Sequence, residues 1–258
     1  MKMPLTLDDV LLNFTLFAAP FLRISGMLIA APIFSAAGFN LRTRTLLAVL
    51  VAALVAPSLP APPFETIFSA RGLLGGVTEI GVGLMIGFVL QLAFAAAVFA
   101  AQAQSMTMGL GFAMAVDPQN GVQVPVVAQM FVILITLLFL ALDGHLALIA
   151  AVVESYNLVP IGAIGIPTVS LSRVVGLGSL VFTWGIMMAL PVLTALLFIN
   201  IALGVITRAA PQLNIFAVGF PVTIISGLLI MFIVMPIYID ALSRLIEVTV
   251  SASINVFG

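Results

Sequence analysis

The chain has 258 residues, of which 63% are hydrophobic and only 7% are charged, and its formal net charge is −1. Soluble domains carry roughly 25% charged residues, so this composition excludes an ordinary soluble protein, and the near-zero net charge gives no sign of nucleic acid as a ligand. The sequence has no cysteine and one histidine, which excludes disulfides, a thiolate nucleophile and a Cys- or His-bound metal, and we expect no cofactor.

The three longest uncharged stretches all exceed the ~20 residues that cross a bilayer core. They cover residues 80–116, 174–207 and 209–239. Runs of this length exclude a membrane β-barrel, whose strands are short and alternate in polarity. The sequence therefore predicts an all-α, polytopic membrane protein in one domain, residues 1–258, with about six or seven kinked helices. The N-terminus carries no cleavable signal pattern, so we expect the first apolar segment to remain in the mature protein.

The predicted helices follow one another with polar or proline-rich breaks. Asp8 or Asp9 is expected to cap the first helix, where an acid suits the positive end of the helix dipole. Proline is expected to kink or end a helix that contains it, here at Pro20, Pro32, Pro191 and Pro236. The predicted helices are 9–34, 46–56, 71–103, 126–142, 145–157, 172–208 and 222–250. The breaks are a basic turn at 40–44, a proline-rich connector at 57–63, a Pro/Gly loop at 159–168 and an interruption at 208–221.

The third predicted helix carries two GxxxG pairs, Gly72 with Gly76 and Gly83 with Gly87. Small residues at this spacing let helix backbones approach closely in lipid. The pairs are equally consistent with packing inside the chain and with a contact to a neighbouring subunit.

Arg23 lies inside the first predicted helix and Glu79 inside the third. Charges at membrane depth are costly and usually pair or face water. A direct Arg23–Glu79 pair is one interpretation. The favoured one is that each side chain reaches the interface or pairs with a neighbouring subunit.

The motif Asp143-Gly144-His145 contains an acid and a base, but a turn is the favoured interpretation because Asp and Gly punctuate chains. Asp117 and Asp143 resemble an intramembrane aspartyl protease dyad, which needs two facing carboxylates. Both, however, sit beside turn residues at the ends of apolar segments. The sequence also lacks a GxSxG elbow and a Walker lysine motif, so we expect no enzymatic activity.

A second turn or packing motif interrupts the apolar region near residue 210. Its polar and helix-breaking residues either bend the chain and satisfy backbone groups or form a plain loop between spans. The residues of this motif are Arg208, Pro211, Gln212, Asn214 and Phe216.

The segment between the third and fourth predicted helices is rich in Gly, Met and Phe. Glycine allows a backbone to move, and Met packs against many shapes. From the residues alone, an ordinary helix end followed by a turn is favoured over a soft apolar element that blocks a path. The residues concerned are Met106, Met108, Gly109, Leu110, Gly111, Phe112, Ala113, Met114, Asp117 and Pro118.

The chain resembles the FliR family of type III export proteins along almost its whole length. The matching pieces, in order, are LRISGMLIAAPIFSAAG, EIGVGLMIGF, GLGFAMAVDPQNGVQVPV, FLALDGHLALI with SYNLVPIG, and RAAPQLNIFAVGFP. The most specific combination is APQLNIF followed by GFP, downstream of the DGH motif and a DP-type loop.

The resemblance implies a structural pore subunit of the flagellar type III protein export gate. It implies FliP and FliQ as partners, FlhB and FlhA nearby, unfolded export substrates and membrane lipid, without nucleic acid. It places the protein in the bacterial inner membrane at the flagellar basal body, with the gate raised toward the periplasm. It also implies that residues 109–114, with Asp117-Pro118, plug the pore. A multi-span solute transporter or channel subunit, with a site between broken helices, remains an alternative, as does the protease.

Overall fold

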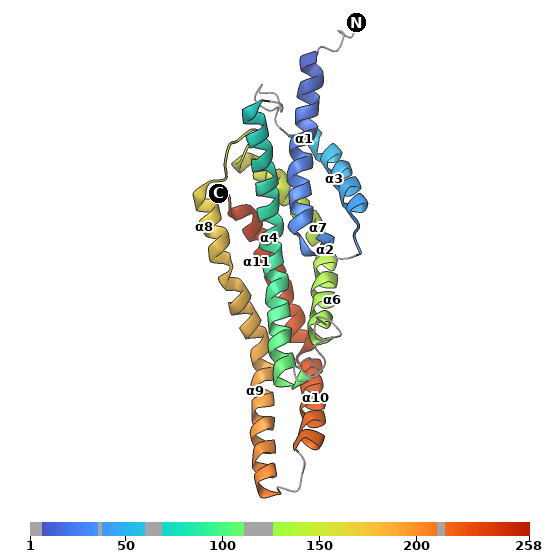
Figure 1. Cartoon of the computed structure of the whole chain (residues 1–258), viewed down its shortest axis with the longest axis vertical. Helices are drawn as coiled ribbons and strands as arrows, with labels where there is room; N and C mark the ends of the chain where they lie inside the picture. Colours follow the sequence, from blue (N-terminus) through green and yellow to red (C-terminus); the bar gives the residue numbers. More distant parts are fainter. Residues whose placement is uncertain (1–6, 36–37, 60–68, 111–125, 211–214) are drawn as a thin grey trace. The chain divides into compact units, whose positions relative to one another are not determined.

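The computed structural model describes residues 7–35, 38–59, 69–110, 126–210 and 215–258, with side chains except at 7–13 and 215–217 (Figure 1). All of the regular structure in these ranges is helical, which confirms the predicted all-α class. The helices are α1 (Leu7–Ala30), α2 (Pro32–Ser35), α3 (Leu41–Val55), the 3-10 turn η1 (Ala56–Ser58), α4 (Ala70–Thr107), α6 (Val126–Ala141), α7 (Gly144–Leu158), α8 (Thr168–Leu177), α9 (Ser179–Ala209), α10 (Ile215–Ile233) and α11 (Met235–Asn255).

The basic turn predicted at residues 40–44 is wrong, because α3 already begins at Leu41. Asn40 caps this helix: its side-chain Oδ1 accepts a hydrogen bond from the Thr43 backbone N–H at 2.9 Å. An Asn in this position satisfies a backbone donor that the helix itself leaves unpaired. Arg42 and Arg44 therefore lie in the first turn of a helix.

The prolines act according to where they fall in each helix. Pro20 and Pro191 lie inside α1 and α9 without ending them. Pro32 instead starts α2 after the break at Ala31, and Pro236 lies in the first turn of α11 after the break at Val234. Proline fits the first helical turn because the N–H it lacks has no partner there. Interior prolines are tolerated in membrane helices whose neighbours satisfy the freed carbonyl groups.

Several predicted segments differ from the observed helices. The predicted helices 9–34 and 222–250 are divided at Ala31 and Val234, shortly before Pro32 and Pro236. The predicted helix 172–208 begins earlier and is divided at Gly178 into α8 and α9. The predicted interruption at 208–221 is too long, because α10 already begins at Ile215 and contains Pro221.

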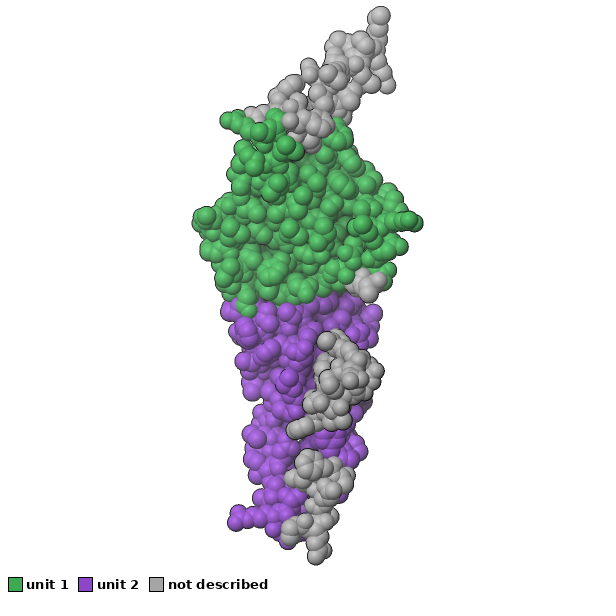
Figure 2. Space-filling view, in the orientation of Figure 1, with its two compact units in different colours: residues 1–92, 143–178, 246–258 green, residues 93–142, 179–245 purple. Residues whose placement is uncertain are grey.

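The chain divides into two compact units, coloured separately in Figure 2. Unit 1 comprises residues 1–92, 143–178 and 246–258, and unit 2 comprises residues 93–142 and 179–245. Each unit is therefore built from segments far apart in sequence, and α4 and α11 each contribute residues to both. The assignment of one family domain to residues 1–258 stays a prediction.

Glycines bring the backbones of α1 and α4 into direct contact in unit 1. A Cβ added to Gly83 would lie 1.9 Å from the Arg23 carbonyl oxygen, and one added to Gly87 would lie 2.5 Å from that of Met27. Any larger residue at either position would force the two helices apart. The Gly83–Gly87 pair thus packs inside the chain, which settles the alternative left open by the sequence for that pair.

Within the described residues, three helical stretches are long and apolar enough to cross a membrane, or up to five if each of two bent helix pairs forms one span. They differ in how much of their surface the chain covers. The apolar window of α4 is 67% buried, whereas the window in residues 168–209 is only 22% buried. Most of the apolar surface of α9 is therefore left for lipid or for another protein.

Candidate functional site

The two charges predicted inside helices meet in unit 1. Arg23 on α1 donates a hydrogen bond from Nε to Oε2 of Glu79 on α4 at 2.6 Å, and their side chains are 0% and 4% exposed. The structure therefore shows the direct ion pair. The favoured interpretation, in which the charges reach the interface or a neighbouring subunit, is wrong because both side chains are enclosed by their own chain.

Helix α7 supplies the remaining partners of Arg23. The guanidinium donates from Nη1 to Ser155 Oγ at 2.7 Å and from Nη2 to the Val159 carbonyl at 2.9 Å. Its carbon lies 3.6 Å from the centre of the Tyr156 ring, whose hydroxyl donates to Glu79 Oε2 at 3.3 Å. A buried charge is tolerated when it is paired and its other donors are satisfied. This buried charge cluster therefore ties α1, α4 and α7 together.

The α7 contribution was missed by the sequence analysis. Ser155 and Tyr156 lie more than 70 residues from Glu79 and 130 from Arg23 along the chain. No local spacing links residues so far apart. The only available signal was the polar SYN triplet at the end of an otherwise apolar helix.

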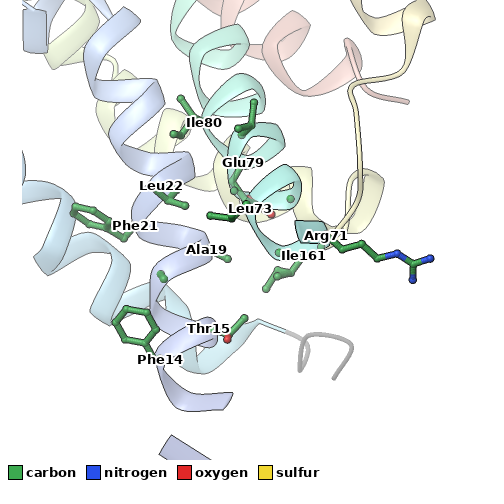
Figure 3. A pocket seen from close by; sticks show the side chains of 16 residues that line it. Phe14, Thr15, Ala19, Phe21, Leu22, Arg71, Leu73, Glu79, Ile80 and Ile161 are labelled. Carbon is green, nitrogen blue, oxygen red and sulfur yellow. The ribbon is translucent and has the colours of Figure 1, made fainter. Parts of the chain in front are cut away.

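A pocket of about 500 Å³ lies beside the cluster, between α1 and the first turns of α4. Figure 3 shows apolar side chains such as Leu22 and Ile80 around it, while Arg71 extends away. Gly72 and Gly76 both line its wall, and a Cβ added to Gly76 would lie 3.3 Å from Cδ1 of Leu22 on α1. Because the Glu79 carboxylate is held by Arg23, the pocket offers little polar chemistry for catalysis.

The residues of the predicted pore plug begin at the end of α4, in unit 2. Met106 is still helical and is 71% exposed, whereas Met108 is 0% exposed. Gly109 has φ +83°, a left-handed conformation that favours glycine, and Leu110 is half-buried. The helix thus ends at a glycine in the left-handed conformation, as a plain helix end also would. The other predicted plug residues lie outside the described residues: Gly111, Phe112, Ala113, Met114, Asp117 and Pro118.

The last turns of α4 are held by polar contacts to other helices of unit 2. The fully buried Gln104 donates from Nε2 to the Tyr238 hydroxyl on α11 at 2.9 Å and to the Met188 carbonyl on α9 at 3.3 Å. The Tyr238 ring also contacts Phe131 of α6 edge to face, with centroids 5.1 Å apart. Gln104 therefore fixes the end of α4 against its neighbours just before the chain turns at Gly109.

The turn interpretation of Asp143-Gly144-His145 is confirmed. Asp143 has φ 52° and stands at the N-cap of α7, and its carbonyl accepts from the backbone N–H groups of Leu146 and Ala147 at 2.9 and 3.1 Å. His145 Nδ1 has no hydrogen-bond partner in the part of the chain that the structure describes. Asp117 lies outside that part.

The motif near residue 210 is described only at its edges. Arg208 is exposed in the last turn of α9. Phe216 belongs to α10, but its side chain is outside the described set, as are Pro211, Gln212 and Asn214. Among the described His, Asp and Glu residues, no group of three is placed to hold a metal ion.

Comparison with known proteins gives a consistent result. The chain matches the family described as "Bacterial export proteins, family 1" over residues 14–249. It is similar to the flagellar biosynthetic protein FliR of Escherichia coli (strain K12), with 39% identity over 222 residues, 86% of this chain and 85% of the relative. It is 40% identical over 221 residues to FliR of Pectobacterium carotovorum subsp. carotovorum, covering 86% and 84%. FliR of Bacillus subtilis (strain 168) is 24% identical over 256 residues, 98% of each chain.

Proposed function

The chain belongs to the FliR family of bacterial export proteins, and from this premise we propose that it is a pore subunit of the flagellar type III export gate. The family is structural, so the chain is not an enzyme, and membership displaces the protease and solute-transporter alternatives. We propose that the protein assembles with FliP and FliQ, next to FlhB and FlhA, in the bacterial inner membrane. The assembly would provide the channel through which unfolded flagellar proteins leave the cell.

The uneven coverage of the helices is the observation that carries this proposal. Only 22% of the apolar window in residues 168–209 is buried, compared with 67% in α4. Large apolar side chains remain exposed along the α9–α10 hairpin, including Phe182, Phe198, Ile201, Val205, Ile225, Leu229 and Phe232. Exposed apolar patches of this extent mark an interface with protein or lipid.

The breaks in the helices favour protein as the main covering. The chain interrupts its helices at Gly178 and at Val234, between apolar segments on either side. Irregular backbone at membrane depth is tolerated where protein buries it or where it lines an aqueous cavity. Partner subunits packed around α9 and α10 satisfy this requirement, whereas lipid alone does not.

We further propose that residues 109–114, with Asp117-Pro118, form a plug in the pore. The sequence of this segment, GLGFAM, combines two glycines with Phe112 and Met114. A channel for unfolded chains of many sequences needs a seal that adapts to its cargo and still excludes water and ions. Glycine provides backbone freedom, and Met provides an apolar side chain with many accessible shapes.

Deletion of residues 109–114 tests the plug. The expected result is an assembled complex of normal composition that leaks ions or small solutes across the membrane more than the wild type. Ile164→Ser is the matched control, because Ile164 is an apolar residue, 54% exposed, in a different loop. Unchanged leakage from the deletion variant, in a complex that has assembled, would refute the plug.

A further inference from the structure

We propose that Thr223 and Gly227 of α10 are positioning residues that hold Met108 and Gly109, at the base of the proposed plug, in place; we call this pair the α10 latch. The inference rests on the proposed function, because it assigns a means of control to the same plug. The described contacts that carry it all lie in unit 2, between the end of α4 and one face of α10.

The first contact is a hydrogen bond to the end of α4. Thr223 Oγ1 donates to the Met108 carbonyl oxygen at 3.1 Å, and the Thr223 side chain is nearly buried. The last four carbonyls of a helix have no partner within it. Thr223 therefore supplies a donor to a carbonyl at the end of α4, and it does so from a different helix.

The same hydroxyl has a second acceptor in its own helix. Thr223 Oγ1 also lies 2.9 Å from the Phe220 carbonyl, an i−3 contact common for Thr in helices. A hydroxyl has one proton to donate. When the contact to Met108 is lost, the proton can go to Phe220 and no donor is stranded. The hydrogen bond can therefore be broken at low cost on the α10 side, as a releasable contact requires.

The second contact is a notch for the Met108 side chain. A Cβ added to Gly227 would lie 2.6 Å from Met108 Cγ, 2.7 Å from Cε and 2.9 Å from Sδ. Glycine inside a helix lowers stability by about 0.5–1 kcal/mol relative to Ala. Gly227 therefore makes α10 less stable but leaves space for the Met108 side chain. Because Met is unbranched and flexible, it fills the notch and can also leave it.

A third contact holds the turn itself. Gly109 has φ +83°, and a Cβ there would lie 2.7 Å from Cε2 of the Phe220 ring. Phe220, Thr223 and Gly227 are spaced i, i+3 and i+7 and so share one face of α10. By contrast, Met106 is 71% exposed. Among the described residues, these contacts of α10 are made with Met108 and Gly109, where the predicted plug begins.

The test uses the assembled complex with substitutions in α10. Thr223→Val removes the hydroxyl with little change in shape, Thr223→Ser keeps it, and Gly227→Ala and Gly227→Leu fill the notch by increasing amounts. The matched controls are Thr136→Val on α6 and Gly176→Ala on α8. The Thr136 hydroxyl donates within its own helix at 2.7 Å, and a Cβ on Gly176 meets nothing within 4 Å.

Two measurements are made on each variant, namely amide hydrogen exchange in residues 104–110 and ion leakage. Loss of one hydrogen bond predicts about five- to tenfold faster exchange in Thr223→Val, and an increase that grows from Gly227→Ala to Gly227→Leu. Thr223→Ser and both controls are expected to match the wild type. Leakage is expected to rise in the same order as exchange.

Different results would overturn the proposed plug and the proposed α10 latch. Exchange in Thr223→Val and Gly227→Leu within twofold of the wild type would overturn the latch, even if deletion of residues 109–114 leaks. Faster exchange without leakage, in complexes whose plug deletion does leak, would also overturn it. If the plug deletion itself does not leak, the proposed plug is wrong, and exchange alone then decides whether α10 holds Met108.

Discussion

Removal of the Arg23 guanidinium should open the contact between α1 and α4. In Arg23→Met, the Glu79 carboxylate stays in a site where its side chain is 4% exposed and keeps only the hydrogen bond from Tyr156, at 3.3 Å. Removal of one partner from a buried ion pair costs about 3–5 kcal/mol, because the other charge is left without compensation. Local opening of α1 should become more favourable by that amount.

Hydrogen exchange of α1 amides in the assembled complex measures this change directly. A loss of about 3 kcal/mol or more corresponds to exchange that is faster by about 100-fold or more. Arg42→Met, which removes an exposed arginine from α3, is the matched control and should leave α1 unchanged. Less than tenfold faster exchange in Arg23→Met would refute the argument from burial.

The double variant Arg23→Met with Glu79→Leu sharpens the test. Replacement of both partners by apolar residues is often nearly neutral, so the double variant should exchange more slowly than Arg23→Met alone. It should stay above the wild type, because the Val159 carbonyl loses the donor that lies at 2.9 Å. Charge reversal is a weaker test, since a carboxylate at position 23 cannot donate to that carbonyl. A double variant as unstable as the single one would show that the pair is not what couples the helices.

Three further predictions concern packing and surface charge. Gly83→Ala should abolish assembly, judged by the yield of purified complex, because its Cβ would lie 1.9 Å from the Arg23 carbonyl oxygen. The control Gly176→Ala, whose Cβ would meet nothing within 4 Å, should assemble normally. Equal yields of the two variants would contradict the tight packing of α1 against α4. Gln104→Leu should speed amide exchange at the end of α4 by about tenfold, through loss of its bonds to α9 and α11; an unchanged rate would mean that those bonds do not hold the helix end. Asp240→Asn should shift the melting temperature of the complex very little, because the exposed Asp240–Arg244 pair at 3.1 Å is worth about 0.3–0.5 kcal/mol; a large drop would show that this pair is buried by a partner.

The order of the helices was predictable because long apolar stretches and their polar breaks are local features of the sequence. The observed α4, α6 and α7 begin and end within a few residues of the predicted bounds. The division at Gly178 was not predicted as a break, because apolar residues continue on both sides of it, whereas the division at Val234 lies two residues before Pro236, where a kink or helix end was expected. Hydropathy indicates whether a segment lies in water or in an apolar environment. Whether two neighbouring apolar segments form one helix or two depends on tertiary packing.

The candidate sites were predictable to different degrees. Arg23 and Glu79 stand out as charges in apolar helices, yet their direct pairing depends on the glycine contacts that bring α1 against α4. The burial of Met108 and the exposure of Met106 could not be distinguished by composition. Met106 lies in the last turn of α4 and Met108 just beyond its end, and the position of α10 decides which one is covered.

The mass and composition of the purified complex test the account most directly. The chain should be co-expressed with the other small apolar proteins encoded beside it, extracted in mild detergent and weighed by native mass spectrometry. The account predicts a large hetero-oligomer that contains this chain with two other small apolar proteins, corresponding to FliP and FliQ. A monomer or a homo-oligomer of this chain, in a preparation where the other proteins are present and folded, would contradict the account.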